Sequence, residues 1–390
     1  MTKILFVLTP RFNPNTGGVQ RTTFKLGKYF NEKGLDVYYY SFHQSGHTDE
    51  IYGTLHHSLQ PGNCNNPENI SHLKDCIKAI GPNIVINQMP YEKPLRKALY
   101  ECKNEVGYSL IGCLRNSLFV FISNVKDVAG GILKGPLNFL INNKVGHSIL
   151  NYLHKVKHAK DLKEILDLHD YYILLGPPNQ TELEFFIGKY KTEKVSCIPN
   201  SIPSVEYSPE SKEKVLLYVG RVIKAQKRVE FLLPVWQRIC HSLPDWRFVI
   251  IGDGDDKEAM MKQIENQQIP RVEMLGFQKP EDYYRRASVF LMTSSFEGFP
   301  NVIIEAQSFG VVPVVFNSYL VLPWIVNDNK DAMLCKPFDT NEMADKILGL
   351  AKNDEKRKKM EVEAIKNAGR FTIDKVGMIW LDFFKKIGKY

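Results

Sequence analysis

Two glutamates, Glu297 and Glu305, bracket a segment suited to holding an anion. The apolar run Val289–Met292 predicts a buried strand. The polar loop after it leads to Pro300, where we expect a helix to begin and to run to about Phe309. A helix that starts after a strand presents backbone N–H groups and a positive dipole end to an anion. Since carboxylates repel phosphate, the glutamates would instead grip hydroxyl pairs beside it, which describes a nucleotide-sugar.

The residues alone leave an ordinary alternative open. Two glutamates around such a loop are commonly solvated side chains that interact with the helix dipole.

The run Glu297-Gly-Phe-Pro-Asn-Val-Ile-Ile-Glu305 resembles the E-x7-E motif of family-4 retaining glycosyltransferases. The resemblance covers most of the chain and is strongest over residues 196–310. It implies a GT-B fold and metal-independent sugar transfer from a nucleotide-diphosphate donor, with UDP-sugar favoured. By the same resemblance Glu305 accepts hydrogen bonds from the ribose diol, and Glu297 orients the transferred sugar as a catalytic residue. The remaining donor-binding positions of the motif are Gly298, Phe299, Pro300, Asn301 and Val302.

Two cations follow another expected strand, Val215–Val219. Arg221 and the pair Gln226-Lys227 are similar to family positions that hold the donor diphosphate and neutralise it as it leaves. A guanidinium gives bidentate contacts and an ammonium a mobile point charge, so both suit this task. Taken without the resemblance, Arg221 and Lys227 would be read as surface charges. Arg228 stands where the family usually has glycine.

Two further donor-binding positions rest on partial matches. Gly276-Phe277 resembles the loop whose main chain reads the base, although Phe277 would also suit core packing. Asn200 stands where the family has Asn-Gly, but Ser201 replaces that glycine.

In the first half, Gly17-Gly18 follows an expected strand and opens an expected helix, which lets a backbone approach a phosphate or sugar closely. A similar loop in the family touches donor and acceptor. Arg115 appears where many relatives carry a histidine beside the reacting sugar. Arginine cannot act as a general base near neutral pH. We therefore expect it to stabilise phosphate charge or to bind an anionic acceptor.

Asp253-Gly254-Asp255 matches the D-x-D metal motif by letter only. It follows an expected strand as a tight turn, so we expect no metal there and no metal requirement.

Composition is that of an ordinary globular chain. The 390 residues, 44% hydrophobic and 24% charged, favour two domains. No stretch reaches the ~20 apolar residues that cross a bilayer. Seven scattered cysteines without C-x-x-C spacing favour reduced thiols and a cytoplasmic location.

Positive charge gathers between residues 112 and 160, where seven Lys/Arg stand against one acid, giving a local charge of +6. The basic residues are Arg115, Lys126, Lys134, Lys144, Lys155, Lys157 and Lys160, and the acid is Asp127. Apolar residues lie between them, so the stretch could rest on an anionic membrane surface. The alternative is a solvated helical insertion. Nucleic acid is not expected, because no binding module is present.

Apolar runs alternate with helical segments along the chain and predict two doubly wound parallel-sheet α/β domains, Rossmann-like and facing across a crevice. The expected strands are Ile4–Leu8, Asp36–Phe42, Asn83–Gln88, Tyr108–Leu114, Tyr171–Leu175, Val195–Ile198, Val215–Val219, Arg247–Ile251, Val272–Leu275, Val289–Met292 and Val312–Phe316. The expected domains are residues 1–200 on the acceptor side and 213–371 for the donor, joined by a Pro-rich linker over 201–212. An amphipathic helix over 372–390 has Val376, Ile379, Trp380, Phe383 and Phe384 as its apolar stripe. The resemblance implies that this helix returns to the first domain.

The predicted function is sugar transfer to a hydroxyl of a glycan or lipid-linked glycan, in surface polysaccharide synthesis, by a cytoplasmic or peripheral membrane enzyme. One alternative is a sugar-nucleotide epimerase of the same fold, whose acid/base carboxylates the sequence does not identify. Another is a catalytically degenerate sugar-nucleotide-binding protein at a membrane surface. A dinucleotide oxidoreductase is disfavoured, since no G-x-G-x-x-G follows a strand.

Overall fold

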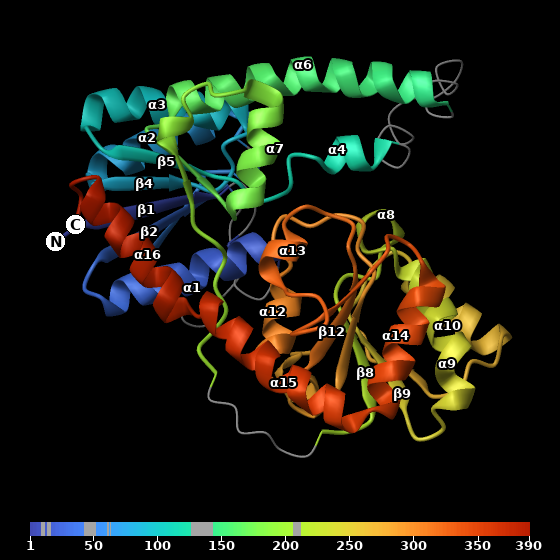
Figure 1. Cartoon of the computed structure of the whole chain (residues 1–390). Coiled ribbons are helices and arrows are strands. Elements are labelled where there is room, and N and C mark those ends of the chain that lie inside the picture. The colour runs from blue at the N-terminus through green and yellow to red at the C-terminus, as the bar shows by residue number, and fades with distance from the viewer. Residues whose placement is uncertain are drawn as a thin grey trace. The chain divides into compact units, whose positions relative to one another are not determined.

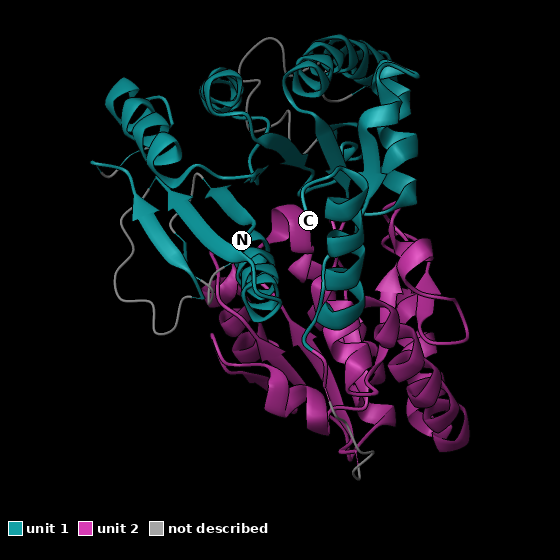
Figure 2. Ribbon diagram, turned by 90° about the vertical axis from the view of Figure 1, so that its left-hand side faces the viewer, with its two compact units in different colours: residues 1–203, 372–390 teal, residues 204–371 magenta. Residues whose placement is uncertain are grey.

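The computed structural model describes residues 1–8, 12–13, 17–42, 52–60, 62, 64–125, 143–205 and 212–390. It divides into two compact units (Figures 1 and 2). Unit 1 contains residues 1–203 and 372–390, and unit 2 contains residues 204–371. Each unit is built around its own parallel sheet, so the prediction of two doubly wound parallel-sheet domains is confirmed.

Unit 1 holds a 7-stranded sheet in the order β3-β2-β1-β4-β5-β6-β7. Its strands are β1 (Lys3–Leu8), β2 (Asp36–Ser41), β3 (Thr54–His57), β4 (Ile84–Asn87), β5 (Ser109–Cys113), β6 (Tyr171–Leu174) and β7 (Val195–Cys197). Its helices are α1 (Gly18–Glu32), α2 (Pro67–Ile80), α3 (Lys93–Val106), α4 (Val120–Ser123), α6 (Lys144–Leu168), α7 (Pro177–Ile187) and α16 (Ile373–Lys386), with a short 3-10 turn η2 (Thr192–Lys194).

Both faces of this sheet are buried, which explains why its strands are continuous apolar runs. Ile4, Phe6 and Leu8 of β1 pack on one face with residues of α1 and α16. Leu5 and Val7 point to the other face, where α2 and α3 cover them. Trp380 of α16 meets Phe30 of α1 edge-on, and Phe384 packs against the same ring at a tilt. One member of the predicted stripe is wrong: Ile379 is 42% exposed, while the other four are buried.

Unit 2 holds a 6-stranded sheet in the order β10-β9-β8-β11-β12-β13. Its strands are β8 (Val215–Val219), β9 (Arg247–Ile251), β10 (Val272–Met274), β11 (Val289–Met292), β12 (Val312–Phe316) and β13 (Met333–Cys335). Its helices are α8 (Lys224–Lys227), α9 (Leu232–Ile239), α10 (Lys257–Asn266), α11 (Glu281–Arg286), α12 (Asn301–Ser308), α13 (Leu322–Ile325), α14 (Thr340–Lys352) and α15 (Asp354–Ala368), with 3-10 turns η3 (Val229–Phe231), η4 (Cys240–Ser242) and η5 (Gly369–Phe371).

Strands β3 and β13 are absent from the sequence prediction. They are edge strands of four and three residues. All seven cysteines are free thiols. In the described part of the chain, no helix combines the length and apolarity needed to pass through a bilayer. Lys126, Asp127 and Lys134 of the basic stretch, and the linker residues 206–211, lie outside the described residues.

Candidate functional site

The strand order of unit 2 reverses direction between β8 and β11. Loops that follow the two strands on either side of such a reversal diverge, and ligands of doubly wound sheets bind there, at the carboxyl ends of the strands. The loop after β8 carries Arg221 and leads into α8, whose last residue is Lys227. The loop after β11 carries Glu297. The predicted cations and the predicted carboxylate therefore meet at the switch point of this sheet.

Lys227 and Glu297 form an ion pair, with 2.6 Å between Nζ and Oε1. Their side chains are only 13% and 10% exposed. Gln226 donates from Nε2 to the other carboxylate oxygen at 3.2 Å and to the carbonyl of Phe296 at 3.2 Å. The sequence prediction assigned these two charges to different parts of a ligand. In the structure, the charge of each side chain is neutralised by the other.

Main-chain contacts fix this geometry. Thr293 Oγ1 donates to the carbonyl of Lys227 at 2.8 Å. Ser295 donates to the carbonyl of Gln226 from its backbone nitrogen at 2.9 Å and from Oγ at 3.2 Å. The start of the β11 loop is thus bonded to α8, and the lysine and the glutamate are positioned by backbone rather than by their own flexible stems.

Arg221 is exposed and belongs to the same network. Its Nη2 donates to Gln226 Oε1 at 2.8 Å, while its carbonyl accepts from Tyr218 Oη at 2.8 Å. Gln226 therefore links Arg221 on one side to Glu297 on the other. This arrangement keeps two cations and one carboxylate within a single hydrogen-bonded group.

Tyrosines beside this group stay protonated. Burial, and next the charge of Glu297, raise the pKa of Tyr218 and of Tyr319 well above the usual value. Tyr319 follows β12, and its hydroxyl has no hydrogen-bond partner among the described residues. The sequence prediction missed Tyr319, and its place just after a strand end was the signal available.

Helix α12 begins one residue later than predicted, at Asn301. Pro300 is its N-cap, with φ −80° and ψ 74°, rather than its first helical residue. No side chain of the described residues makes a cap hydrogen bond there. Glu305 lies in the second turn of α12 and is half-buried. Gly310 has φ +69°, which ends the helix where the sequence indicated.

The backbone at Arg228 is left-handed, with φ +50° and ψ +44°. Glycine adopts this conformation most easily, which explains why the family usually has glycine at this position. Its guanidinium lies 3.4 Å from Glu230 and stacks over Phe338. These contacts with Glu230 and Phe338 hold the Arg228 side chain in place.

The loops after β8, β9 and β10 are joined through glycines. Gly252 donates its backbone N–H to the carbonyl of Gly276 at 2.8 Å, and Gly220 donates to Ile251 at 3.0 Å. Phe277 is 64% exposed, so the core-packing alternative for this residue is wrong. Its ring is available to a ligand beside this edge of the sheet.

The carboxylate of Asp253 is bound by residues of its own turn and of α10. It accepts from the backbone of Gly254 at 2.9 Å and pairs with Lys257 at 3.2 Å. Over the part of the chain that the structure describes, no group of three or more His, Cys, Asp or Glu side chains is arranged to hold a metal ion.

In unit 1 a second polar group joins the ends of three strands. Arg115, after β5, donates from Nε to Gln88 Oε1 at 2.6 Å and from Nη1 to Asn200 Oδ1 at 3.1 Å. Gln88 follows β4, and Asn200 follows β7. Gly17 and Gly18 instead form the start of α1, where Gly17 has φ +66°. The structure thus brings Arg115 and Asn200 together and adds Gln88, which the sequence prediction missed.

Glu182 is another residue that sequence reasoning missed. It is buried and accepts hydrogen bonds from Ser117 Oγ at 2.7 Å and from the Leu118 backbone at 2.8 Å. Burial raises the pKa of this carboxyl, and the hydrogen bonds act in the opposite direction. Glu182 holds the loop that starts at Arg115.

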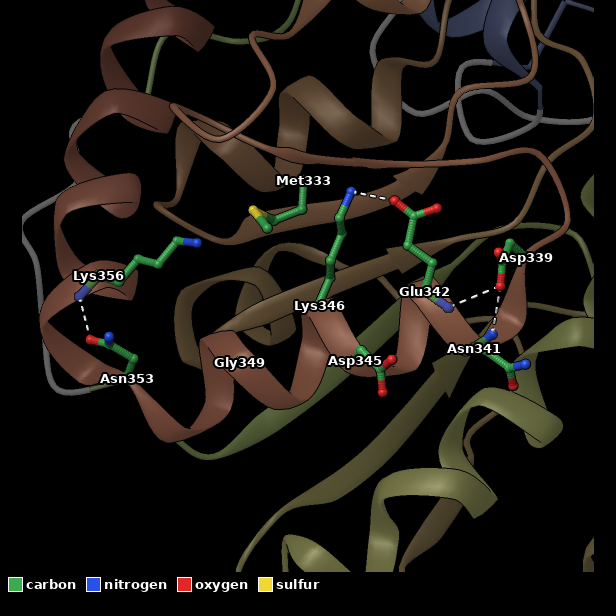
Figure 3. A pocket seen from close by; sticks show the side chains of 9 residues that line it. All are labelled: Met333, Asp339, Asn341, Glu342, Asp345, Lys346, Gly349, Asn353 and Lys356. Atoms are coloured by element: carbon green, nitrogen blue, oxygen red, sulfur yellow. Dashed lines mark hydrogen bonds and ion pairs between the residues drawn. The ribbon is translucent and has the colours of Figure 1, made fainter.

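An open hollow of about 710 Å³ on α14 involves none of the predicted site residues (Figure 3). Several of its polar side chains make hydrogen bonds or ion pairs within unit 2. Asp339 caps α14 through the backbones of Asn341 and Glu342, and Lys346 pairs with Glu342 at 2.8 Å. We assign it no ligand.

The two parallel-sheet units match the GT-B fold of glycosyltransferase structures. Solved structures agree on the fold. S. aureus TarM, crystallised as a mutant with Fondaparinux, alpha-GlcNAc-glycerol and UDP, has a TM-score of 0.74 at 15% identity and covers 98% of this chain and 100% of its own. Anabaena Alr3699/HepE in complex with UDP-glucose has a TM-score of 0.73 at 14% identity, covering 99% and 100%.

Residues 204–367 match the family model of Glycosyl transferases group 1. An uncharacterized glycosyltransferase of Haemophilus influenzae is 29% identical over 210 residues, which are 52% of this chain but only 58% of that relative. An alpha-1,4-N-acetyl-D-galactosaminyltransferase of Campylobacter jejuni, named for a PP-undecaprenol-linked acceptor, is 29% identical over 297 residues, covering 75% and 78%. These comparisons show that residues 204–367, most of unit 2, are similar to the group 1 glycosyltransferases.

Proposed function

We propose that the chain is a retaining glycosyltransferase that moves a sugar from a UDP-sugar to a hydroxyl of a glycan or lipid-linked glycan, in the synthesis of surface polysaccharide. The Lys227–Glu297 pair at the switch point of the second sheet carries this proposal. Structures of similar fold were crystallised with UDP or UDP-glucose, and the Campylobacter jejuni relative is named for a lipid-linked acceptor.

The pair suggests how a donor would be received. An incoming diphosphate offers Lys227 a stronger partner than one carboxylate, because it carries more charge and more acceptor oxygens. When Lys227 turns to the diphosphate, Glu297 is released to accept hydrogen bonds from hydroxyls of the transferred sugar. The pairing seen in the structure keeps both charges compensated at a mostly buried position.

Catalysis would then rest on charge stabilisation of the leaving group. Arg221, Lys227 and the start of α12 at Pro300 supply positive charge and dipole to the departing diphosphate. The bond from the sugar C1 to the diphosphate oxygen breaks, and a bond from C1 to the acceptor oxygen forms on the same face. The acceptor proton goes to the leaving phosphate oxygen, so no side chain acts as nucleophile. Glu305 would hold the ribose diol, with Gly276 and Phe277 beside the base.

Residues of unit 1 are assigned to the acceptor and the sugar. Gln88 Nε2 and Arg115 Nη2 are buried donors without a partner in the part of the chain that the structure describes. We assign Arg115 to phosphate charge or to an anionic group of the acceptor, with Asn200 fixing its orientation. Gly17 and Gly18 would admit donor or acceptor close to the backbone at the start of α1.

The test is UDP release from a panel of UDP-sugars, with chelator present throughout because the proposed reaction uses no metal ion. Lys227→Met is expected to lower kcat/KM by about 100-fold or more, since charge on the leaving diphosphate loses its partner. Glu305→Gln is expected to weaken donor binding by about tenfold, through loss of a charge-assisted hydrogen bond. Arg228→Gly is the matched control, expected to stay within about twofold, because that side chain is held by Glu230 and Phe338.

Retention is checked by the anomeric configuration of the product relative to the donor. Binding of UDP-sugar without release of UDP would favour a degenerate binding protein. Full activity of Lys227→Met would remove the proposed role of the pair.

A further inference from the structure

The first half of α6 exposes an apolar stripe to solvent. Its large apolar side chains recur at helical spacing, and each is between 46% and 70% exposed: Val145, Ile149, Tyr152, Leu153 and Val156. Residues three and four apart lie on one side of a helix, so these side chains form a single face. Exposed apolar residues are ordinary when scattered, but a continuous row of them marks an interaction surface.

The opposite face of the same helix is already occupied within unit 1. His154 stacks on Phe121 with ring centres 4.2 Å apart, and His158 meets Phe186 edge-on at 4.9 Å. Further along, Leu162 and Ile165 are buried in the core. The inward face is sufficient to fix α6 on unit 1, where Figure 1 shows it running past α7. The outward stripe therefore has no role in this packing.

The second half of α6 is anchored by charge. Arg96 of α3 is buried and donates to Asp161 at 3.4 Å and to Glu164. Asp167 pairs with Lys191 at 2.5 Å. The acids of α6 are thereby compensated by partners on the body of unit 1.

Lysines surround the apolar stripe. Helical spacing places Lys144 and Lys155 along one flank and Lys157 along the other, and Lys160 and Lys163 continue the line of the stripe toward the C-terminal end. Residues 144–160 contain no acid. An open groove of about 660 Å³ begins at Val156, and its lining mixes these last two lysines and Lys93 with the acids Glu164 and Asp167.

An aromatic residue extends the surface beyond α6. Phe185 of α7 is 44% exposed, and the ammonium of Lys155 lies 4.0 Å from the centre of its ring. Tyr152, 67% exposed, offers an apolar ring with a polar tip, which suits the boundary between water and lipid.

We propose that this stripe of α6, with its lysines and Phe185, rests on an anionic lipid bilayer. A bilayer surface supplies both features the face calls for: an apolar boundary at the depth of the acyl chains and negative charge at the headgroups. A protein partner would need to combine the same apolar strip with acids along both flanks. This inference concerns where the chain sits and is independent of the proposed reaction.

The experiment is flotation of the full chain with vesicles of phosphatidylcholine and phosphatidylglycerol in equal parts, against vesicles of phosphatidylcholine alone. We expect binding to the anionic vesicles and little to the neutral ones. The double variant Ile149→Glu/Val156→Glu is expected to lower binding by about tenfold or more, because it removes apolar contact and places acids against the headgroups. Both positions are exposed and glutamate is a better helix former, so the variant should fold.

Met261→Glu/Val362→Glu is the matched control, since it makes the same change at exposed positions of α10 and α15 in unit 2. It should bind like the unaltered chain. Failure of the unaltered chain to bind anionic vesicles, or equal loss in both variants, would overturn the proposal. A lipid-free dimer that the α6 variant alone converts to a monomer, measured by light scattering, would assign the stripe to a second copy instead.

Discussion

Lys227 and Glu297 are seventy positions apart in the chain, yet one carboxylate oxygen and one ammonium meet at 2.6 Å. The sequence indicated that each side chain belongs to a ligand site. It gave no sign that they pair, because pairing depends on how the loops after β8 and β11 approach each other. The hydrogen bonds of Thr293 and Ser295 to α8 settle that approach.

Buried His169 is another polar residue whose state follows from its contacts. Its Nδ1 lies 2.8 Å from the carbonyl of Ile165 and its Nε2 lies 3.1 Å from Asn87 Nδ2, which fits a neutral ring that donates at one nitrogen and accepts at the other. Burial, as the main cause, lowers the pKa of His169 from 6.5 to about 4.

We therefore expect His169 to make stability fall with acid. Because its pKa is lower in the folded chain, the unfolded chain takes up the proton first. The stability it contributes is present above pH 6.5 and is lost as the pH falls toward 4, on the order of 2 to 3 kcal/mol. Urea unfolding at several pH values should show a shallower pH dependence for His169→Gln. The same replacement at the exposed His241 is the control, and equal slopes for both variants would contradict this account.

Among the elements, the carboxyl edge of the second sheet depends on glycine. A Cβ at Gly252 would lie 1.8 Å from the carbonyl oxygen of Gly220, and the backbone there has φ +144°. The loops after β8 and β9 approach each other too closely for any side chain. Position 252 therefore requires glycine for a steric reason. The adjacent D-x-D motif, Asp253-Gly254-Asp255, gives no indication of it.

Gly252→Ala is accordingly expected to destabilise unit 2 by about 2 kcal/mol or more, since the loops must separate and the backbone is strained. Gly349→Ala is a matched control inside α14, where a new Cβ meets nothing within 4 Å. That change should stabilise by about 0.5 to 1 kcal/mol, through helix propensity. Urea unfolding measures both, and a neutral result at position 252 would refute the close approach.

Helix and strand positions were largely predictable, because buried parallel strands read as apolar runs with helices between them. Four strands of unit 2, β8, β9, β11 and β12, have the predicted bounds. The misses have local causes. Pro300 fits a cap as well as a first turn, and an apolar residue type such as that of Phe277 does not by itself show whether the side chain is buried.

On the scale of the whole molecule, the polypeptide enters unit 2 after residue 203 and returns to unit 1 at residue 372. The returning segment is part of the core of unit 1, because α16 packs in the same hydrophobic cluster as β1 and α1. Which helix face packs there was mostly predictable from its apolar spacing. The exposure of Ile379 shows that spacing alone overestimates the width of the buried face.

Trp380→Ala is expected to lower the stability of unit 1 by about 3 to 5 kcal/mol, because it empties a buried site beside Phe30 and Phe384. Amide hydrogen exchange should show faster exchange in β1 and α1, with β8 and β9 unchanged. Ile379→Ala, at the adjoining exposed position, should alter neither region. Faster exchange in unit 2 as well would contradict the division into separately stable units.

This chain order has a consequence for synthesis on the ribosome. Residues of unit 2 leave the exit tunnel as one uninterrupted stretch and can fold at once. In unit 1, the face of the sheet that packs against α1 and α16 stays partly exposed until α16 has been translated. We therefore expect chaperones to bind unit 1 during synthesis.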